Sequence, residues 1–207
     1  MKLYYFGVYA RGEPIRMLLN HGKIKYEEQT VTFAEWGAMK GSGKFEFGQL
    51  PGLEWEDGTM MTQTFSILRA LGMKYGYYPT GDPTQMWLCD STIDAVYDLL
   101  PKASDIFFKP TDGEKAEALK AFCDTHFPNF LRIMNTRLNG RVTMTGKLSI
   151  ADFALGAFLS ISCYNMNSPH QAALENVVKN YPNVVAFWQN FAKENAEWLA
   201  KRPASFF

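Results

Sequence analysis

The order of apolar and polar positions divides the chain into a mixed first part and a helical second part. Positions 2 to 8 are rich in aromatic and β-branched residues, so we expect a buried strand there, and we expect a second strand over 26 to 31. Between them, Ile15 and Leu18 recur at helical spacing behind Glu13-Pro14, a pair suited to the first turn of a helix. The order strand, helix, strand predicts a right-handed crossover.

The stretch from Phe47 to Leu71 predicts a hairpin followed by a helix. A loop ends at Pro51, a strand covers 53 to 56, and the dipeptide Asp57-Gly58 is typical of a tight hairpin turn. A second short strand follows, and a helix begins near Gln63-Thr64. The glycine-containing region from 33 to 46, before this stretch, is not expected to form one long helix.

Two backbone features of this stretch are suited to holding a small peptide. The Leu50-Pro51 bond is a candidate cis bond, which leaves the N–H and C=O of Leu50 free to pair with an extended peptide. The first turn of the following helix directs unpaired N–H groups and the positive end of the helix dipole at a carboxylate.

Together these residues resemble the glutathione-binding half of a cytosolic glutathione transferase. The family pattern Gln-Leu-Pro, Asp-Gly, Gln-Ser-x-x-Ile-Leu-Arg is matched by Gln49-Leu50-Pro51, by Asp57-Gly58 and by 63 to 69, with Thr64 in place of the usual serine. A thioredoxin-like hairpin without a glutathione site is the alternative. A redox thioredoxin is not indicated, because the first strand-to-helix turn, 7 to 12, has no cysteine.

The resemblance implies an α/β thioredoxin-like domain of order β-α-β-α-β-β-α followed by an all-α domain. We expect the first domain over residues 1 to 78, a Pro- and Gly-marked linker over 79 to 83, and the helical domain over 84 to 207. In the second part, helices are predicted over 84 to 108, bent or interrupted at Pro101, and over 113 to 138, capped by Asp112 and containing Pro128. Ser149 with Asp152 predicts a capping box, and helices over 169 to 179 and 183 to 200 complete the chain.

Composition and charge agree with a soluble protein of the cytoplasm. The 207 residues are 47% apolar, and 21 basic residues balance 21 acidic ones, so no basic surface for nucleic acid or anionic membranes is expected. The three cysteines have no C-x-x-C spacing, and the N-terminus lacks the pattern of a signal peptide. His21, His126 and His170 are far apart in sequence, so we expect no metal site.

The candidate catalytic residues are Tyr5 and Arg11. A thiol reacts as its thiolate, and one hydrogen bond to that anion, worth about 1.5 to 3 kcal/mol, lowers the thiol pKa substantially. Resemblance to the sigma, mu and pi classes selects Tyr5, which precedes Phe6, over Tyr4 on the opposite face of the strand. Arg11 matches an arginine beside the sulfur in sigma-like members, although Tyr9-Ala10 replaces the Arg-Gly of the family turn. A core role for Tyr5 and a solvated Arg11 are the alternatives.

The resemblance also assigns the glutathione-binding residues. Trp36 with either Lys40 or Lys44 meets the glycyl end, whereas Gln49 and the Leu50 backbone at Pro51 hold the cysteinyl part. Gln63 and Thr64 then hold the γ-glutamyl carboxylate.

A homodimer is implied as well. Asp94 matches an acid that reaches the γ-glutamyl amine from the neighbouring subunit, and Phe47 matches an aromatic residue inserted into the partner. A solvated Asp94 and a Phe47 buried in its own domain are the alternatives.

The function implied is a glutathione transferase that ionises glutathione and conjugates it to hydrophobic electrophiles. The electrophile is expected between the 7 to 11 turn, the end of the 84 to 108 helix, and Phe206-Phe207. One alternative is a glutathione-dependent isomerase resembling prostaglandin D synthase, although residues 101 to 108 lack the tryptophan of its sigma-like members. The other is a non-catalytic relative, crystallin-like or ligand-binding.

Overall fold

A computed structural model describes the whole chain, residues 1–207. Its first part is a four-stranded sheet of β1 (Lys2–Tyr5), β2 (Glu27–Thr30), β3 (Gly52–Glu54) and β4 (Met60–Thr62), in the order β2-β1-β3-β4. β1 is parallel to β2, and the pairs β1 with β3 and β3 with β4 are antiparallel. With the helices α1 (Glu13–His21), α2 (Phe33–Met39) and α3 (Thr64–Tyr75), this is the expected thioredoxin-like order.

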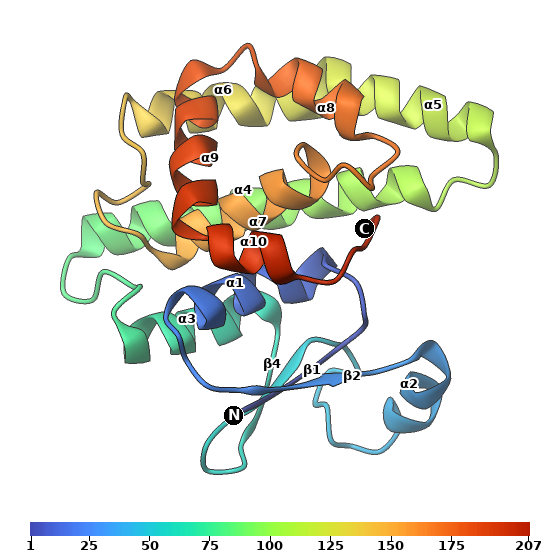
Figure 1. Cartoon of the computed structure of the whole chain (residues 1–207), viewed down its shortest axis with the longest axis vertical. Coiled ribbons are helices and arrows are strands. Elements are labelled where there is room, and N and C mark those ends of the chain that lie inside the picture. Colours follow the sequence, from blue (N-terminus) through green and yellow to red (C-terminus); the bar gives the residue numbers. More distant parts are fainter.

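The two faces of this sheet are covered differently. Helices α1 and α3 lie between the sheet and the helical part of the chain, whereas α2 lies apart from them (Figure 1). Leu3 and the apolar side of α1 belong to the main core, which continues into the helical part. Tyr4 points to the other face, where it forms a small separate cluster with Val31 and Phe45. Strand alternation therefore places Tyr4 and Tyr5 on opposite sides.

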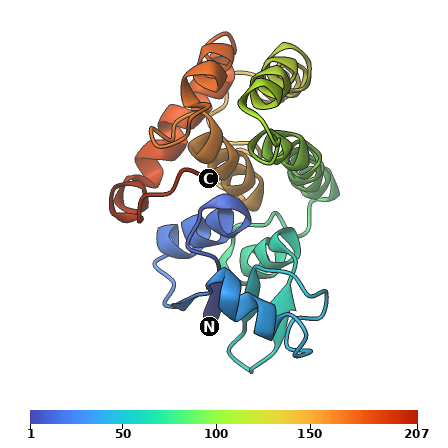
Figure 2. The same ribbon diagram turned by 90° about the vertical axis from the view of Figure 1, so that its right-hand side faces the viewer.

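The rest of the chain is entirely helical and packs on α1 and α3 (Figure 2). Its helices, in order, are α4 (Pro83–Phe107), α5 (Asp112–Ala121), α6 (Phe127–Leu138), α7 (Ile150–Ser162), α8 (Gln171–Val178), α9 (Pro182–Glu194) and α10 (Ala196–Lys201). Helix α7 is the central one, because it is buried from Ile150 to Ser160 and contacts α1, α4 and α9. No helix combines the length and the apolar character that crossing a membrane requires.

Several helix boundaries differ from those predicted. α4 continues through Pro101, and the 113 to 138 segment is divided by a π-helical turn at Phe122–His126. Pro128, which has no N–H to donate, follows this π-helical turn in the first turn of α6. The N-cap of α5 is Thr111 and not Asp112, since the Thr111 hydroxyl accepts the Glu114 N–H. The last predicted helix is divided at Asn195 into α9 and α10.

The predicted capping box at α7 is confirmed, and it is buried. The Asp152 carboxylate accepts the N–H and the hydroxyl of Ser149, both at 2.7 Å, and the N–H of Met144 at 2.6 Å. Next to this box, the Ile150 N–H donates to the Tyr77 carbonyl at 2.9 Å. The start of the central helix is thereby joined to the segment between α3 and α4. This contact helps to hold the sheet and the helical part in one orientation.

Candidate active site

A polar cleft opens beside the β3–β4 hairpin and the start of α3. Its volume is about 340 Å³, and its lining residues are Arg11, Trp36, Lys40, Gly48, Gln49, Leu50, Pro51, Gln63, Thr64 and Tyr97. Most residues that the sequence assigns to glutathione binding therefore surround one space. Tyr5, Lys44 and Asp94 do not line this cleft.

The Leu50 edge of the cleft offers an unpaired peptide group. The Leu50-Pro51 bond is cis, as the sequence indicates. β3 begins only at Gly52, and neither the N–H nor the C=O of Leu50 has a hydrogen-bond partner in the chain. An extended peptide lying along this edge can pair with both groups, as a further strand pairs with a sheet edge.

The start of α3 forms the opposite wall. Gln63 has a φ of 69°, an uncommon conformation for a residue other than glycine, and its side chain does not cap the helix. Its Nε2 instead donates to the Gln49 Oε1 at 3.2 Å, while the Thr64 hydroxyl donates to the Arg11 carbonyl at 3.1 Å. The N–H groups of the first turn stay available to an anion, and the helix dipole favours one there.

The two candidate lysines are placed differently. Lys40 lines the cleft, with its aliphatic part beside Gly48. The Lys44 ammonium donates to the Tyr4 hydroxyl at 2.8 Å and to Glu54 at 3.2 Å, and Lys44 does not line the cleft. Of the two alternatives that the sequence leaves open, only Lys40 borders the cleft.

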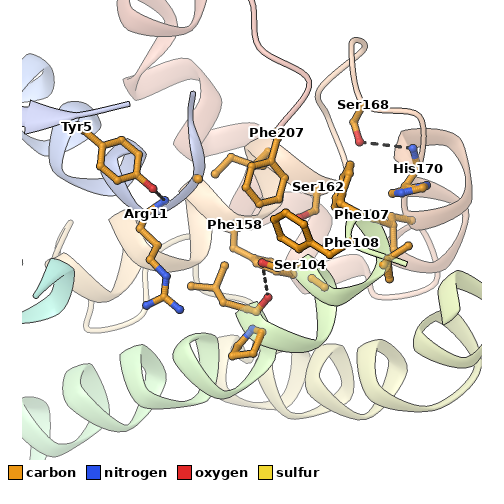
Figure 3. Close-up of a pocket in the computed structure, with 17 residues that line it drawn as sticks. Tyr5, Arg11, Ser104, Phe107, Phe108, Phe158, Ser162, Ser168, His170 and Phe207 are labelled. Atoms are coloured by element: carbon orange, nitrogen blue, oxygen red, sulfur yellow. Dashed lines mark hydrogen bonds between the residues drawn. The ribbon is translucent and has the colours of Figure 1, made fainter. Parts of the chain in front are cut away.

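An apolar cavity adjoins the polar cleft, and Arg11 lines both. The cavity has a volume of about 310 Å³ and lies between the β1–α1 turn, the end of α4, α7 and the 168 to 174 segment (Figure 3). It is lined by Tyr5, Ala10, Arg11, Leu100, Pro101, Ala103, Ser104, Ile106, Phe107, Phe108, Phe158, Ile161, Ser162, Ser168, His170, Leu174 and Phe207. The contributions of α7 and of the 168 to 174 segment are absent from the sequence-based expectation, because no local motif marks them.

Tyr5 stands at the end of β1 where the cavity meets the turn. Its side chain is only 4% exposed, and a Cβ on Gly12 would overlap its ring, which explains the glycine there. The Tyr5 hydroxyl accepts the Arg11 N–H at 3.0 Å, so its own hydrogen is not used by the chain. Burial raises the pKa of Tyr5, although the Arg11 N–H and the positive charges of Arg16 and Arg11 oppose this rise. The phenol is therefore neutral at pH 7 and can donate a hydrogen bond to an anion.

Arg11 spans the boundary between the two spaces. Its guanidinium lies over the Tyr97 ring, 5.2 Å from the ring centroid, and the residue lines both the cleft and the cavity. A negative charge at this boundary would lie near both a cation and the Tyr5 hydroxyl.

The Tyr9-Ala10 pair, where the sequence departs from the family turn, is covered by the C-terminal segment. Tyr9 is buried, and the Arg202 guanidinium lies 4.1 Å from the centroid of the Tyr9 ring. The backbone N–H of Tyr9 donates to the Phe207 carbonyl at 2.8 Å. Phe207 lines the apolar cavity, whereas Phe206 is 59% exposed. The C-terminal segment therefore lies over this turn and reaches the cavity.

Two predicted residues lie on the outer surface of this chain. The Asp94 carboxylate is 72% exposed and lies 3.7 Å from the Arg69 guanidinium. Phe47, in the loop before the cleft, is 57% exposed. Neither contacts the cleft of its own chain.

Comparisons with known proteins agree on one family. Residues 97–202 match the family model described as glutathione S-transferase, C-terminal domain. The chain is 29% identical over 207 residues to a glutathione S-transferase of Anopheles gambiae, covering 98% of this chain and 96% of the relative. It is 36% identical over 157 residues to glutathione S-transferase P 1 of Xenopus laevis, covering 74% and 72% of the two chains.

Solved structures show the same fold. The structure of prostaglandin synthase D of Nilaparvata lugens superposes with a TM-score of 0.83 over 99% of this chain and 98% of that chain, at 23% identity. At 23% identity, this similarity is evidence of a shared fold alone.

Proposed function

Because the chain belongs to the glutathione transferase family, we propose that Tyr5 ionises glutathione bound in the polar cleft and that the thiolate attacks a hydrophobic electrophile in the apolar cavity. The observation that carries this proposal is the Tyr5 hydroxyl, which lines the apolar cavity, accepts the N–H of Arg11, the residue shared by the two spaces, and keeps its own hydrogen free. Substitution of Tyr5 by Phe tests it.

The residues around the proposed sulfur position can supply the free energy needed to lower the pKa of the glutathione thiol. An ordinary thiol has a pKa near 8.5 and is only a few per cent ionised at pH 7, and a shift of about two units corresponds to about 2.7 kcal/mol. A hydrogen bond to an anion contributes about 1.5 to 3 kcal/mol, and the Arg11 cation adds to it. The Tyr5 hydroxyl and Arg11 together are therefore sufficient to keep a bound thiol mainly ionised.

The tripeptide follows the cleft from end to end. Its cysteinyl part pairs with the N–H and C=O of Leu50 beside Pro51, near Gln49, and this places the sulfur toward Tyr5. Its γ-glutamyl carboxylate binds at the start of α3, to Thr64 and Gln63. Its glycyl carboxylate lies near Trp36 and the Lys40 ammonium.

Exchanging each lysine separately tests this orientation. Lys40→Ala is expected to raise the KM for glutathione about tenfold with little change in kcat, since a charged hydrogen bond to the ground state is lost. Lys44→Ala is the matched control and is expected to leave this KM within about twofold, because Lys44 is paired with Glu54. Steady-state kinetics at fixed electrophile measures both. A larger effect of Lys44→Ala would reverse the assignment.

The apolar character of the second cavity supports a hydrophobic co-substrate. Apart from Arg11, no charged side chain lines it, and four phenylalanine rings border it. Stoichiometry distinguishes conjugation from the alternative isomerase reaction: conjugation consumes one glutathione for each product, whereas isomerisation releases it again. We also place the protein in the cytoplasm, where its three free thiols are stable.

The proposed enzyme is a homodimer. Phe47, Met73 and Trp87 are more than half exposed on this chain, and exposed apolar side chains of this size are typical of an interface. In the dimer, Phe47 is buried by the partner, and Asp94 reaches the γ-glutamyl amine in the partner's cleft.

Two matched pairs of variants test the dimer. Phe47→Ala is expected to weaken dimerisation at least tenfold in sedimentation equilibrium. Phe33→Ala removes a ring that is even more exposed, at 79%, but that stacks on Phe6 of its own chain, and it is expected to leave dimerisation unchanged. Asp94→Ala is expected to raise the KM for glutathione several-fold, and Asp98→Ala, one turn later in α4, is not. A monomeric parent protein would overturn the shared site.

A further inference from the structure

Polar side chains lie at both ends of the apolar cavity. Tyr5 and Arg11 lie at one end, Ser168 and His170 lie at the other, and aromatic rings stand between them (Figure 3). The first end is occupied by the proposed thiolate chemistry. The function proposed above gives the second end no role.

The chain uses only part of the hydrogen-bonding capacity at the far end. His170 is only 9% exposed, and its buried Nε2 atom has no hydrogen-bond partner in the chain. The Ser168 hydroxyl accepts the backbone N–H of His170 at 3.4 Å and donates to no group of the chain. Ser162, at the end of α7, also lines the cavity without a hydrogen bond from its hydroxyl. An unpaired buried polar group is destabilising by about 1 to 3 kcal/mol, so such groups are usually matched by a partner.

These side chains are held in place by the structure around them. The His170 ring packs against Phe107 with 4.6 Å between centroids, and the His170 carbonyl accepts the N–H of Leu174 at the start of α8. The loop before it is anchored by Asn165, whose side chain donates to the Ser205 carbonyl at 2.9 Å. A site with fixed hydrogen-bonding groups selects its ligand more strongly than a mobile one.

We propose that Ser162, Ser168 and His170 form a subsite for an uncharged oxygen, a hydroxyl or a carbonyl, at the end of the electrophile remote from its reacting carbon. This inference rests on the function proposed above and names its substrate class. The substrate is elongated, with an electrophilic carbon beside Tyr5, an apolar middle between the phenylalanine rings, and one oxygen at the far end.

An uncharged oxygen fits this end better than a carboxylate. The only cationic lining residue, Arg11, lies at the opposite end of the cavity. Burial, with a smaller contribution from Lys115, lowers the pKa of His170, so its ring is neutral at pH 7. A carboxylate would lose its hydration without gaining a counter-charge among the lining residues.

Binding of S-substituted glutathiones tests the subsite independently of catalysis. The probes are S-alkylglutathiones of increasing chain length, each compared with its ω-hydroxy and ω-carboxy derivative by isothermal titration calorimetry. At the length that reaches the subsite, we expect the ω-hydroxy compound to bind about tenfold more tightly than the alkyl compound, and the ω-carboxy compound to show no such gain.

Variants at the far end identify the groups responsible. His170→Phe keeps the ring against Phe107 and removes the nitrogen atoms, so the preference for the hydroxyl should fall to about twofold or less. His170→Gln, which retains an amide in reach of the Nε2 position, should keep most of it, and Ser168→Ala should reduce it. Ser104→Ala is the control, because the Ser104 hydroxyl is already used by the Leu100 carbonyl. Thermal unfolding of each variant shows that it is folded.

The outcomes distinguish a failure of the proposed glutathione site from a failure of the proposed subsite. If S-methylglutathione does not bind, the glutathione site itself is wrong, and the subsite falls with it. If all S-alkylglutathiones bind but no chain length shows a preference for the hydroxyl, the subsite alone is wrong. A preference that survives in His170→Phe and in Ser168→Ala would likewise overturn it. A stronger gain for the ω-carboxy compound would show that the subsite takes an anion.

Discussion

Tyr5→Phe is expected to lower kcat/KM for conjugation at pH 7 by about 10- to 100-fold while the protein still binds glutathione. The substitution removes one donor of a hydrogen bond to the thiolate, an effect of about 1.5 to 3 kcal/mol. The apolar ring remains in place against Gly12, so the cleft keeps its shape. The bound thiol should then stay largely protonated, and the ultraviolet absorbance of the thiolate measures this directly.

The pH dependence identifies this effect as one on the thiol. In Tyr5→Phe, the rise of kcat/KM with pH should occur about one to two pH units higher than in the parent enzyme. The difference in kcat/KM between the two enzymes should therefore become smaller above about pH 9. Tyr4→Phe is the matched control, because the Tyr4 hydroxyl donates to Glu54 at 2.9 Å on the other face of the sheet. Unchanged absorbance and turnover in Tyr5→Phe would remove Tyr5 from the mechanism.

Asp152→Ala is expected to give the largest loss of stability of the single substitutions considered. The change leaves the backbone N–H groups of Met144 and Ser149 without an acceptor inside the protein. At about 1 to 3 kcal/mol for each such group, the free energy of unfolding should fall by roughly 3 to 4 kcal/mol, or about 10 °C in Tm. Urea unfolding followed by fluorescence measures this change.

Asp152→Asn separates the hydrogen bonds from the charge. It retains one acceptor oxygen, so its loss of stability should be smaller than that of the alanine variant. Burial raises the pKa of Asp152 from 3.8 to about 6, so the folded state binds the proton more tightly than the unfolded state. The stability that this raised pKa gives to the folded state is therefore fully present below pH 3.8 and is lost as the pH rises through 6.

The matching measurement compares stability at pH 4 and pH 7. The stability advantage of the parent protein over Asp152→Asn should be larger at the lower pH, and an advantage that increases toward pH 7 would contradict the raised pKa. Loss of activity in Asp152→Ala at temperatures where it remains folded would point to a second role for this residue.

Features that depend on neighbouring residues were predictable from the sequence. The hairpin at Asp57-Gly58, the cis bond before Pro51 and the capping box at Ser149 are each determined within a few residues, by turn geometry or by side-chain hydrogen bonds to the adjacent backbone. Helix boundaries were less accurate where competing local signals occur. Thr111 and Asp112 can both cap a helix, and only the Thr111 hydroxyl does so.

The sequence by itself determined the fold class, the family and most of the polar cleft, because Gln49 to Thr64 form one continuous stretch whose backbone shape is encoded locally. Only the tertiary structure decided that Lys40 borders this cleft and Lys44 does not, and that Arg11 lines two spaces. It also brought Tyr5 and His170 to the two ends of one cavity. The physical reason is that this cavity is bounded by side chains far apart in sequence, whose meeting depends on how α1, α4 and α7 pack together.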